Sequence, residues 1–178
     1  LNNFLKSNGI NEKDLEVEKE FVFVLTPFHE QFLEDFKTIK NICSNVGLRC
    51  ERGDEKFYRG DIFSQILKSI VKANLIIANI NGRNANVLYE LGIAQALDKP
   101  TIFIAKSVED IPLDIKSKRF IIYKSDLDGR ITDNEFDLLH EMEGQNDFFE
   151  YFELVVSDLK LVNKSKLFKL IGYKRANI

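Results

Sequence analysis

The chain has 178 residues, of which 44% are hydrophobic and 30% charged, and its formal net charge at pH 7 is −3. This length suits one domain with a proper core and is short for two, and the composition is that of a soluble globular protein. The slightly acidic balance argues against a protein that binds nucleic acid. No apolar run approaches the roughly 20 residues that span a bilayer, and no signal peptide is recognisable.

The first predicted elements are a short helix and a linker within residues 1–20, which are polar and weakly periodic and which could end an upstream domain. Residues 21–25 are apolar throughout, which is typical of a parallel strand buried on both faces. An amphipathic helix that ends at Gly47 follows, with apolar residues three or four apart at Phe32, Phe36, Ile39 and Cys43. Cys43 and Cys50, the two cysteines, lack metal-ligand spacing and suit buried positions in a reducing cytoplasm.

Strands and helices alternate along the rest of the chain. We predict strands over residues 48–50, 75–78, 101–104 and 120–123, and helices over 62–70, 86–97 and 147–162. One domain would therefore cover residues 21–162, and residues 163–178 would form a basic C-terminal tail.

This alternation predicts an α/β fold with a parallel five-stranded sheet and helices on both faces. Right-handed crossovers favour a flavodoxin-like strand order, 2-1-3-4-5. In that order the first and third strands are neighbours, and ligands bind beyond their carboxyl ends. The fold thus nominates the loop Thr26-Pro27-Phe28 and the loop over residues 79–86 as the ligand site.

The loop after the third strand leads to Glu90, the strongest candidate for chemistry. Gly82 permits a close approach of a ligand to the backbone, and Asn84 and Asn86 are both suitable N-caps. Glu90 comes shortly after the helix start, on one flank with Val87, Ala94 and Leu97. The helix N-terminus would favour the ionised carboxylate, as a nucleophile requires, although Glu90 could merely complement the helix dipole.

Residues 84–92, Asn-Ala-Asn-Val-Leu-Tyr-Glu-Leu-Gly, resemble the helix start of the nucleoside 2-deoxyribosyltransferase-like family, in its bacterial stand-alone and effector branches. The resemblance extends over roughly residues 21–123 and includes the first strand with its Pro-Phe loop and the run Arg52-Gly53-Asp54. The sequence departs from the family pattern at Asn79, where an Asp is usual, and at Ala85, where a Pro is usual. The missing Asp weakens the expectation of transfer more than that of hydrolysis.

The resemblance implies that Glu90 acts as nucleophile or charge stabiliser at the sugar C1′. Asn84 stands where transferases of the family have an Asp that holds the sugar, so its expected role is orientation. Arg52 and Arg83 could each pair with a phosphate, and surface charge is the competing interpretation for Arg52. The expected substrate-binding residues are Thr26, Pro27, Phe28, Arg52, Asp54, Asn79, Gly82, Arg83, Asn86 and Tyr89, of which Asn86 and Tyr89 could instead serve capping or packing.

Our leading hypothesis is an enzyme that cleaves, or transfers across, the N-glycosidic bond of a nucleoside, nucleotide or NAD. One alternative is an NAD+ glycohydrolase effector of antiviral defence, similar to Toll/interleukin-1-receptor (TIR)-like domains. The other is a non-catalytic nucleotide-sensing or protein-interaction module. We expect a cytoplasmic homo-oligomer, fused to or partnered with a sensor domain. No cofactor is expected, and no metal, because His29 and His140 lack ligand-spaced partners.

Overall fold

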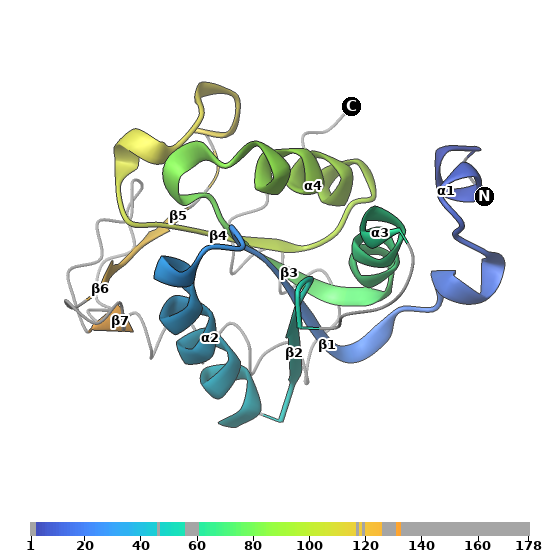
Figure 1. The fold of residues 1–178 in the computed structure, drawn as a ribbon, viewed down its shortest axis with the longest axis horizontal. Coiled ribbons are helices and arrows are strands. Elements are labelled where there is room, and N and C mark those ends of the chain that lie inside the picture. The colour runs from blue at the N-terminus through green and yellow to red at the C-terminus, as the bar shows by residue number, and fades with distance from the viewer. Residues whose placement is uncertain are drawn as a thin grey trace.

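The sheet has the predicted topology. The structure is a computed structural model that describes residues 3–45, 47–55, 61–116, 118, 120–125 and 131–132. Its main sheet is parallel, in the order β2-β1-β3-β4-β5, so the flavodoxin-like α/β fold is confirmed (Figure 1). The strands are β1 (Glu18–Leu25), β2 (Arg49–Arg52), β3 (Ala73–Asn79), β4 (Thr101–Ala105) and β5 (Phe120–Ile122).

Helices cover both faces of this sheet, as Figure 1 shows. They are α2 (Leu33–Asn45) on one face, and α3 (Ile62–Lys72) and α4 (Ala85–Ala96) on the other. Alternate residues of each strand point to opposite faces, so Val22 and Val24 pack with α2, whereas Phe23 and Leu25 pack with α3 and α4. Two cores result, and the apolar strand runs of the sequence reflect burial on both sides.

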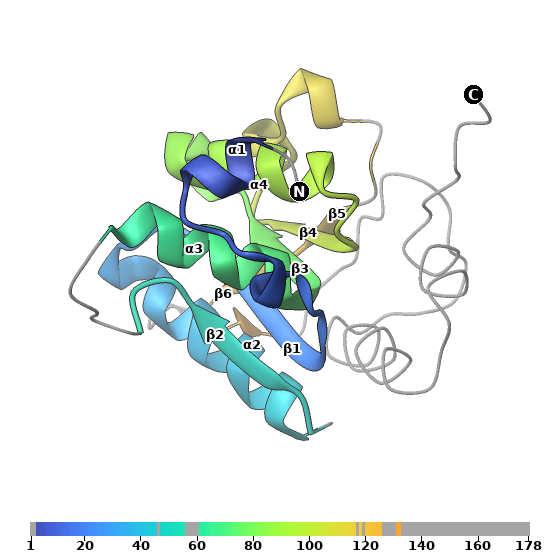
Figure 2. The same cartoon turned by 90° about the vertical axis from the view of Figure 1, so that its right-hand side faces the viewer.

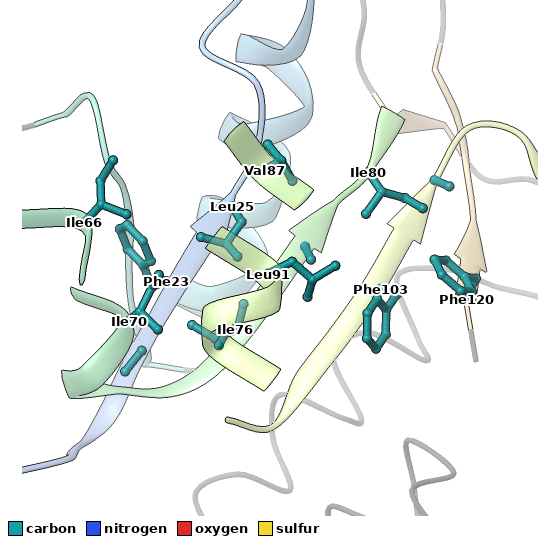
Figure 3. Packing of buried hydrophobic residues seen from close by; sticks show 14 of the residues in the cluster. Phe23, Leu25, Ile66, Ile70, Ile76, Ile80, Val87, Leu91, Phe103 and Phe120 are labelled. Atoms are coloured by element: carbon teal, nitrogen blue, oxygen red, sulfur yellow. The ribbon is translucent and has the colours of Figure 1, made fainter. Parts of the chain in front are cut away.

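The core beneath α3 and α4 brings α4 across the two central strands. Val87 and Leu91 of α4 pack in one cluster with Leu25 of β1 and Ile76 of β3 (Figure 3). This packing fixes α4 over the junction of β1 and β3, where the strand order reverses direction. The helix that carries Glu90 therefore lies at the predicted switch point.

The N-terminal segment packs on the domain instead of forming a free linker. It contains α1 (Asn3–Ser7) and a 3-10 helix (Glu12–Leu15), and β1 starts at Glu18, earlier than predicted. The first three residues of β1 are charged and exposed, which explains why an apolar run did not reveal them. Leu5 and Ile10 are buried against Leu67 and Val71, so α1 lies next to α3 in Figures 1 and 2.

Several features of the second half were not predicted. Two 3-10 helices (Val108–Asp110 and Leu113–Ile115) follow β4, and a small antiparallel pair joins β6 (Lys124–Ser125) to β7 (Ile131–Thr132). The predicted helix over residues 147–162 and the basic tail over 163–178 lie outside the described residues. In the described part of the chain, no helix is both long and apolar enough to cross a membrane.

Candidate active site

The start of α4 is built by Asn84, as its sequence position predicts. The Asn84 side-chain oxygen accepts hydrogen bonds from the backbone N–H groups of Asn86 (3.0 Å) and Val87 (3.2 Å). These bonds satisfy donors that the first helical turn leaves free. Asn86 itself is exposed in the first turn and does not cap the helix. Asn84 therefore sets where α4 begins, and with it the position of Glu90.

Glu90 is buried on a seam between two packing surfaces of α4. Its side chain is only 8% exposed. Val87 and Ala94 of the same flank pack on the sheet, Ile93 packs toward α3, and Leu97 contacts both clusters. Across the part of the chain that the structure describes, Glu90 makes no hydrogen bond and no ion pair. An unpaired buried carboxyl group is costly to ionise, and its presence needs a reason.

Burial raises the pKa of Glu90 from 4.5 to about 7. This corrects the expectation that the helix N-terminus holds the carboxylate ionised. Glu90 is the sixth residue of α4, beyond the first turn where the helix dipole is effective, so desolvation decides its pKa. A carboxyl group with a pKa near 7 can exchange its proton at neutral pH, which is typical of catalytic acids and bases.

Two exposed aromatic side chains, Phe28 and Tyr89, lie near α3. The Phe28 side chain, after β1, is 52% exposed, and that of Tyr89, on α4, is 56% exposed. A Cβ at Gly53 would lie 3.0 Å from the Phe28 ring and 3.1 Å from Ile66, so the loops after β1 and β2 meet α3 here. The Tyr89 ring packs against that of Phe63 of α3, tilted by 39°, at 5.6 Å between ring centroids. Such exposed rings could stack on a base.

Arg52 lies buried at the carboxyl end of β2, which makes the surface-charge interpretation wrong. Its guanidinium donates to both oxygens of Asp54, at 2.5 and 2.7 Å, and stands 4.9 Å from the centroid of the Phe36 ring. Arg52 Nη1 and the hydroxyl of Thr26, which follows β1, are both buried without a hydrogen-bond partner among the described residues. Pro27, which follows Thr26 in the loop after β1, is also buried. The carboxyl ends of β1 and β2 thus each present a buried polar atom that has no hydrogen-bond partner among the described residues.

Arg83 is engaged with its own chain. It follows Gly82 in a left-handed turn, with φ of 67° for Gly82 and 49° for Arg83. The Arg83 guanidinium donates to the carbonyl oxygen of Glu109, which ties the loop before α4 to the 3-10 helix after β4. Gly82 and Arg83 are both exposed. The expected phosphate contact of Arg83 stays a prediction.

Asn79 lies on the other face of the sheet from Glu90. Its side chain is fully buried and its Nδ2 donates to the hydroxyl of Tyr123 at 3.0 Å. Tyr123 belongs to the core beneath α2, whereas the neighbouring Ala78 belongs to the core beneath α4. The structure therefore does not bring Asn79 together with Glu90, and substrate contact by Asn79 stays an untested expectation.

Sequence reasoning missed the network around this tyrosine. Its members are buried or half-buried side chains that follow strand ends or open α2: Asp35, Asn81, Lys106 and Tyr123. One signal was available for Asp35, which falls between Phe32 and Ile39 on the apolar stripe of α2. A carboxylate at such a position indicates a buried polar partner.

Other candidate features lie elsewhere. A surface hollow of about 390 Å³ opens between α2 and β2, lined by Lys40, Ser44, Leu48, Arg49, Cys50, Glu51 and Glu55. It lies on the α2 side and is separate from the expected crevice. Within the described ranges, no group of three or more His, Cys, Asp or Glu side chains is placed to hold a metal ion.

No protein-family model and no curated protein matches the chain. Solved structures that are similar to it include two 2-deoxyribosyltransferases. One is a 2-deoxyribosyltransferase from Bacillus psychrosaccharolyticus, with a TM-score of 0.48 and 18% identity over 56% of this chain and 84% of the other. The second is a 2-deoxyribosyltransferase from Leishmania mexicana, with a TM-score of 0.46 and 16% identity over 77% of this chain and 97% of the other. These likenesses are loose and assign neither a family nor an activity to this chain.

Proposed function

We propose that this protein breaks the N-glycosidic bond of a nucleoside-class substrate, with Glu90 as the nucleophile. The observation that carries the proposal is the burial of the Glu90 carboxyl group without a partner in the described structure. A buried carboxylate with a purely structural role is normally paired, because unpaired burial destabilises the fold. Its place in the run Asn-Ala-Asn-Val-Leu-Tyr-Glu-Leu-Gly, which resembles deoxyribosyltransferase-like sequences, supports the same reading.

The chemistry needs the ionised form of Glu90. One carboxylate oxygen attacks the sugar C1′ while the bond from C1′ to the base nitrogen breaks, and the base leaves with the bonding electron pair. The glycosyl ester of Glu90 is then attacked at C1′ by water, which gives hydrolysis, or by a second base, which gives transfer. Either step regenerates the carboxylate. With a pKa of about 7, a large fraction of Glu90 is ionised at neutral pH.

Unused polar atoms and exposed rings supply contacts for the rest of the substrate. We assign the Thr26 hydroxyl and Arg52 Nη1, both buried without partners in the described ranges, to the sugar or a 5′-phosphate. Phe28 and Tyr89 would stack on the base. The Asn84 side-chain oxygen is used by the helix cap, so its amide N–H group is left to donate to a sugar hydroxyl.

A non-catalytic nucleotide-binding module is the second candidate, and one observation favours it. Asn79 and Asn84 stand where the family that the chain resembles has Asp residues. In this structure both have structural contacts, because Asn79 donates to Tyr123 and Asn84 caps α4. A chain that has lost these carboxylates could bind a nucleotide without cleaving it. Cleavage of the N-glycosidic bond is the primary proposal because the chemistry above depends on Glu90 and not on these two positions. NAD+ is one of its candidate substrates.

Product analysis separates these candidates. The protein is incubated with 2′-deoxyadenosine, 2′-deoxyadenosine 5′-monophosphate and NAD+, and free base is measured by chromatography. We expect base release from at least one probe, its loss in Glu90→Gln, and its retention in Glu16→Gln, an exposed carboxylate at the opposite end of the domain. Tight binding of a probe by calorimetry, without base release, would establish the binding module instead.

A further inference from the structure

The hydroxyl of Tyr123 is the centre of a buried hydrogen-bond network. It accepts from the side-chain amides of Asn79 (3.0 Å) and Asn81 (2.6 Å), and it donates to Asp35 Oδ2 (2.7 Å). Tyr123, Asn79 and Asp35 are each at most 1% exposed. These three hydrogen bonds therefore lie inside the protein, where hydrogen bonds are strong and their loss is costly.

The charged groups around the Tyr123 hydroxyl determine that it donates its hydrogen bond to Asp35. Burial and the neighbouring Asp35 carboxylate raise the pKa of Tyr123 well above its usual range, so the phenol keeps its proton. Asp35 lies in the first turn of α2, where a carboxylate is favoured, and Lys106 Nζ stands 3.1 Å from its Oδ2. Lys106 Nζ also lies 5.6 Å from the centroid of the Tyr123 ring.

The network holds the segment that leads into α4. Asn81 binds Tyr123 through Nδ2, and its Oδ1 accepts from the backbone N–H of Lys106, after β4. The Asn81 backbone N–H donates to Asn79 Oδ1 at 3.3 Å. From Asn81 the chain makes one 3-10 turn, through Arg83, to the cap residue Asn84. The start of α4 is thus anchored from the opposite face of the sheet.

We infer that Tyr123 is a positioning residue for Glu90: its hydroxyl anchors the Asn79–Asn81 segment and so fixes where α4 begins and where it holds the carboxyl group. This rests on the proposed function in treating Glu90 as the reacting group. Tyr123 is not proposed to contact the substrate. It acts through the loop, and a small displacement of α4 moves the nucleophile relative to C1′.

The test compares Tyr123→Phe, which removes only the hydroxyl, with Ile121→Val, which removes one methyl group from the same core. Two readouts need no turnover: hydrogen exchange of the backbone amides of Asn81, Arg83 and Lys106, and titration of the Glu90 carboxyl carbon by NMR. For Tyr123→Phe we expect exchange at least about tenfold faster and a Glu90 midpoint lowered by about half a pH unit, because a loosened α4 admits water. We expect neither change for Ile121→Val.

Turnover supplies the third readout, on whichever of the three probes releases base. Tyr123→Phe should lower kcat about tenfold with KM within about twofold, because the hydroxyl places the nucleophile and does not bind substrate. If Tyr123→Phe changes the exchange of the loop amides and the titration midpoint of Glu90 no more than Ile121→Val does, the positioning role is wrong, whatever the effect on activity. If they shift as expected while the wild-type protein cleaves no probe, the positioning role stands and the proposed function fails.

Discussion

The Tyr123 hydroxyl donates to Asp35 Oδ2 across 2.7 Å, joining the residue after β5 to the first turn of α2. The two residues are 88 positions apart, and both are almost completely buried. Asn79 and Asn81 complete the network, so the end of β3 is held from the α2 side of the sheet. Glu90 lies on the other side, in an apolar seam. One loop therefore joins a polar, hydrogen-bonded face to an apolar face whose carboxyl group, that of Glu90, has no partner among the described residues.

The burial of Glu90 makes protein stability depend on pH. Its pKa is about 7 in the folded protein and about 4.5 in the unfolded chain, so between these values the folded state binds more protons. Stability should therefore be highest below pH 4.5 with respect to this group and should fall as pH rises to 7. The shift of the Glu90 pKa from 4.5 to about 7 corresponds to a loss of about 3 kcal/mol in the free energy of unfolding between low pH and a pH well above 7. Denaturant unfolding of wild type and Glu90→Gln at several pH values checks this, and parallel profiles would contradict it.

The same ionisation should govern turnover. If Glu90 is the nucleophile, kcat/KM for base release should rise with pH along a limb whose midpoint is near 7, because only the carboxylate attacks C1′. Initial rates measured from pH 5 to 9 test this. A rate that does not change across that range, or a limb near pH 4.5, would show that the buried form of Glu90 is not the group that controls the reaction.

The central strands and the apolar flank of Glu90 could be predicted because each depends on local pattern, and the strand order followed from the handedness of the crossovers. Residues 21–25 and 75–78 are continuously apolar, and Glu90 shares a helical flank with apolar residues. The ionisation state of Glu90 could not be predicted, because it depends on how completely Val87 and its neighbours exclude water from the carboxyl group. The Asp35–Tyr123 bond was equally hidden, since it joins distant segments. The face of Asn79 follows from strand alternation with the buried Ala78, a signal that the loop-based interpretation did not use.

Gly53 should be intolerant of a side chain. A Cβ there would lie 3.0 Å from the Phe28 ring and 3.1 Å from Ile66, tighter than normal packing. Gly53→Ala should push the half-exposed Phe28 outward, destabilise the fold by about 1 kcal/mol and raise KM more than it lowers kcat. Gly92→Ala is the matched control, because outside the nearby backbone of α4 no atom of the described residues lies within 4 Å of its added Cβ, and α4 should gain up to about 1 kcal/mol. Equal effects of the two substitutions on KM would exclude a substrate role for Phe28.

Asn84 has one structural and one proposed catalytic role, and substitution can separate them. Asn84→Ala removes the acceptor for the Asn86 and Val87 N–H groups and should destabilise the protein by about 1 kcal/mol. Asn84→Ser keeps a side-chain oxygen that caps the helix, so its stability should match wild type, but it loses the amide N–H group proposed to orient the sugar. We expect Asn84→Ser to unfold like wild type and to show a KM raised several-fold, about what the loss of one hydrogen bond to a sugar hydroxyl gives. If Asn84→Ser binds substrate as well as wild type does, Asn84 serves α4 alone, and the sugar is held by other groups at the ends of β1 and β2.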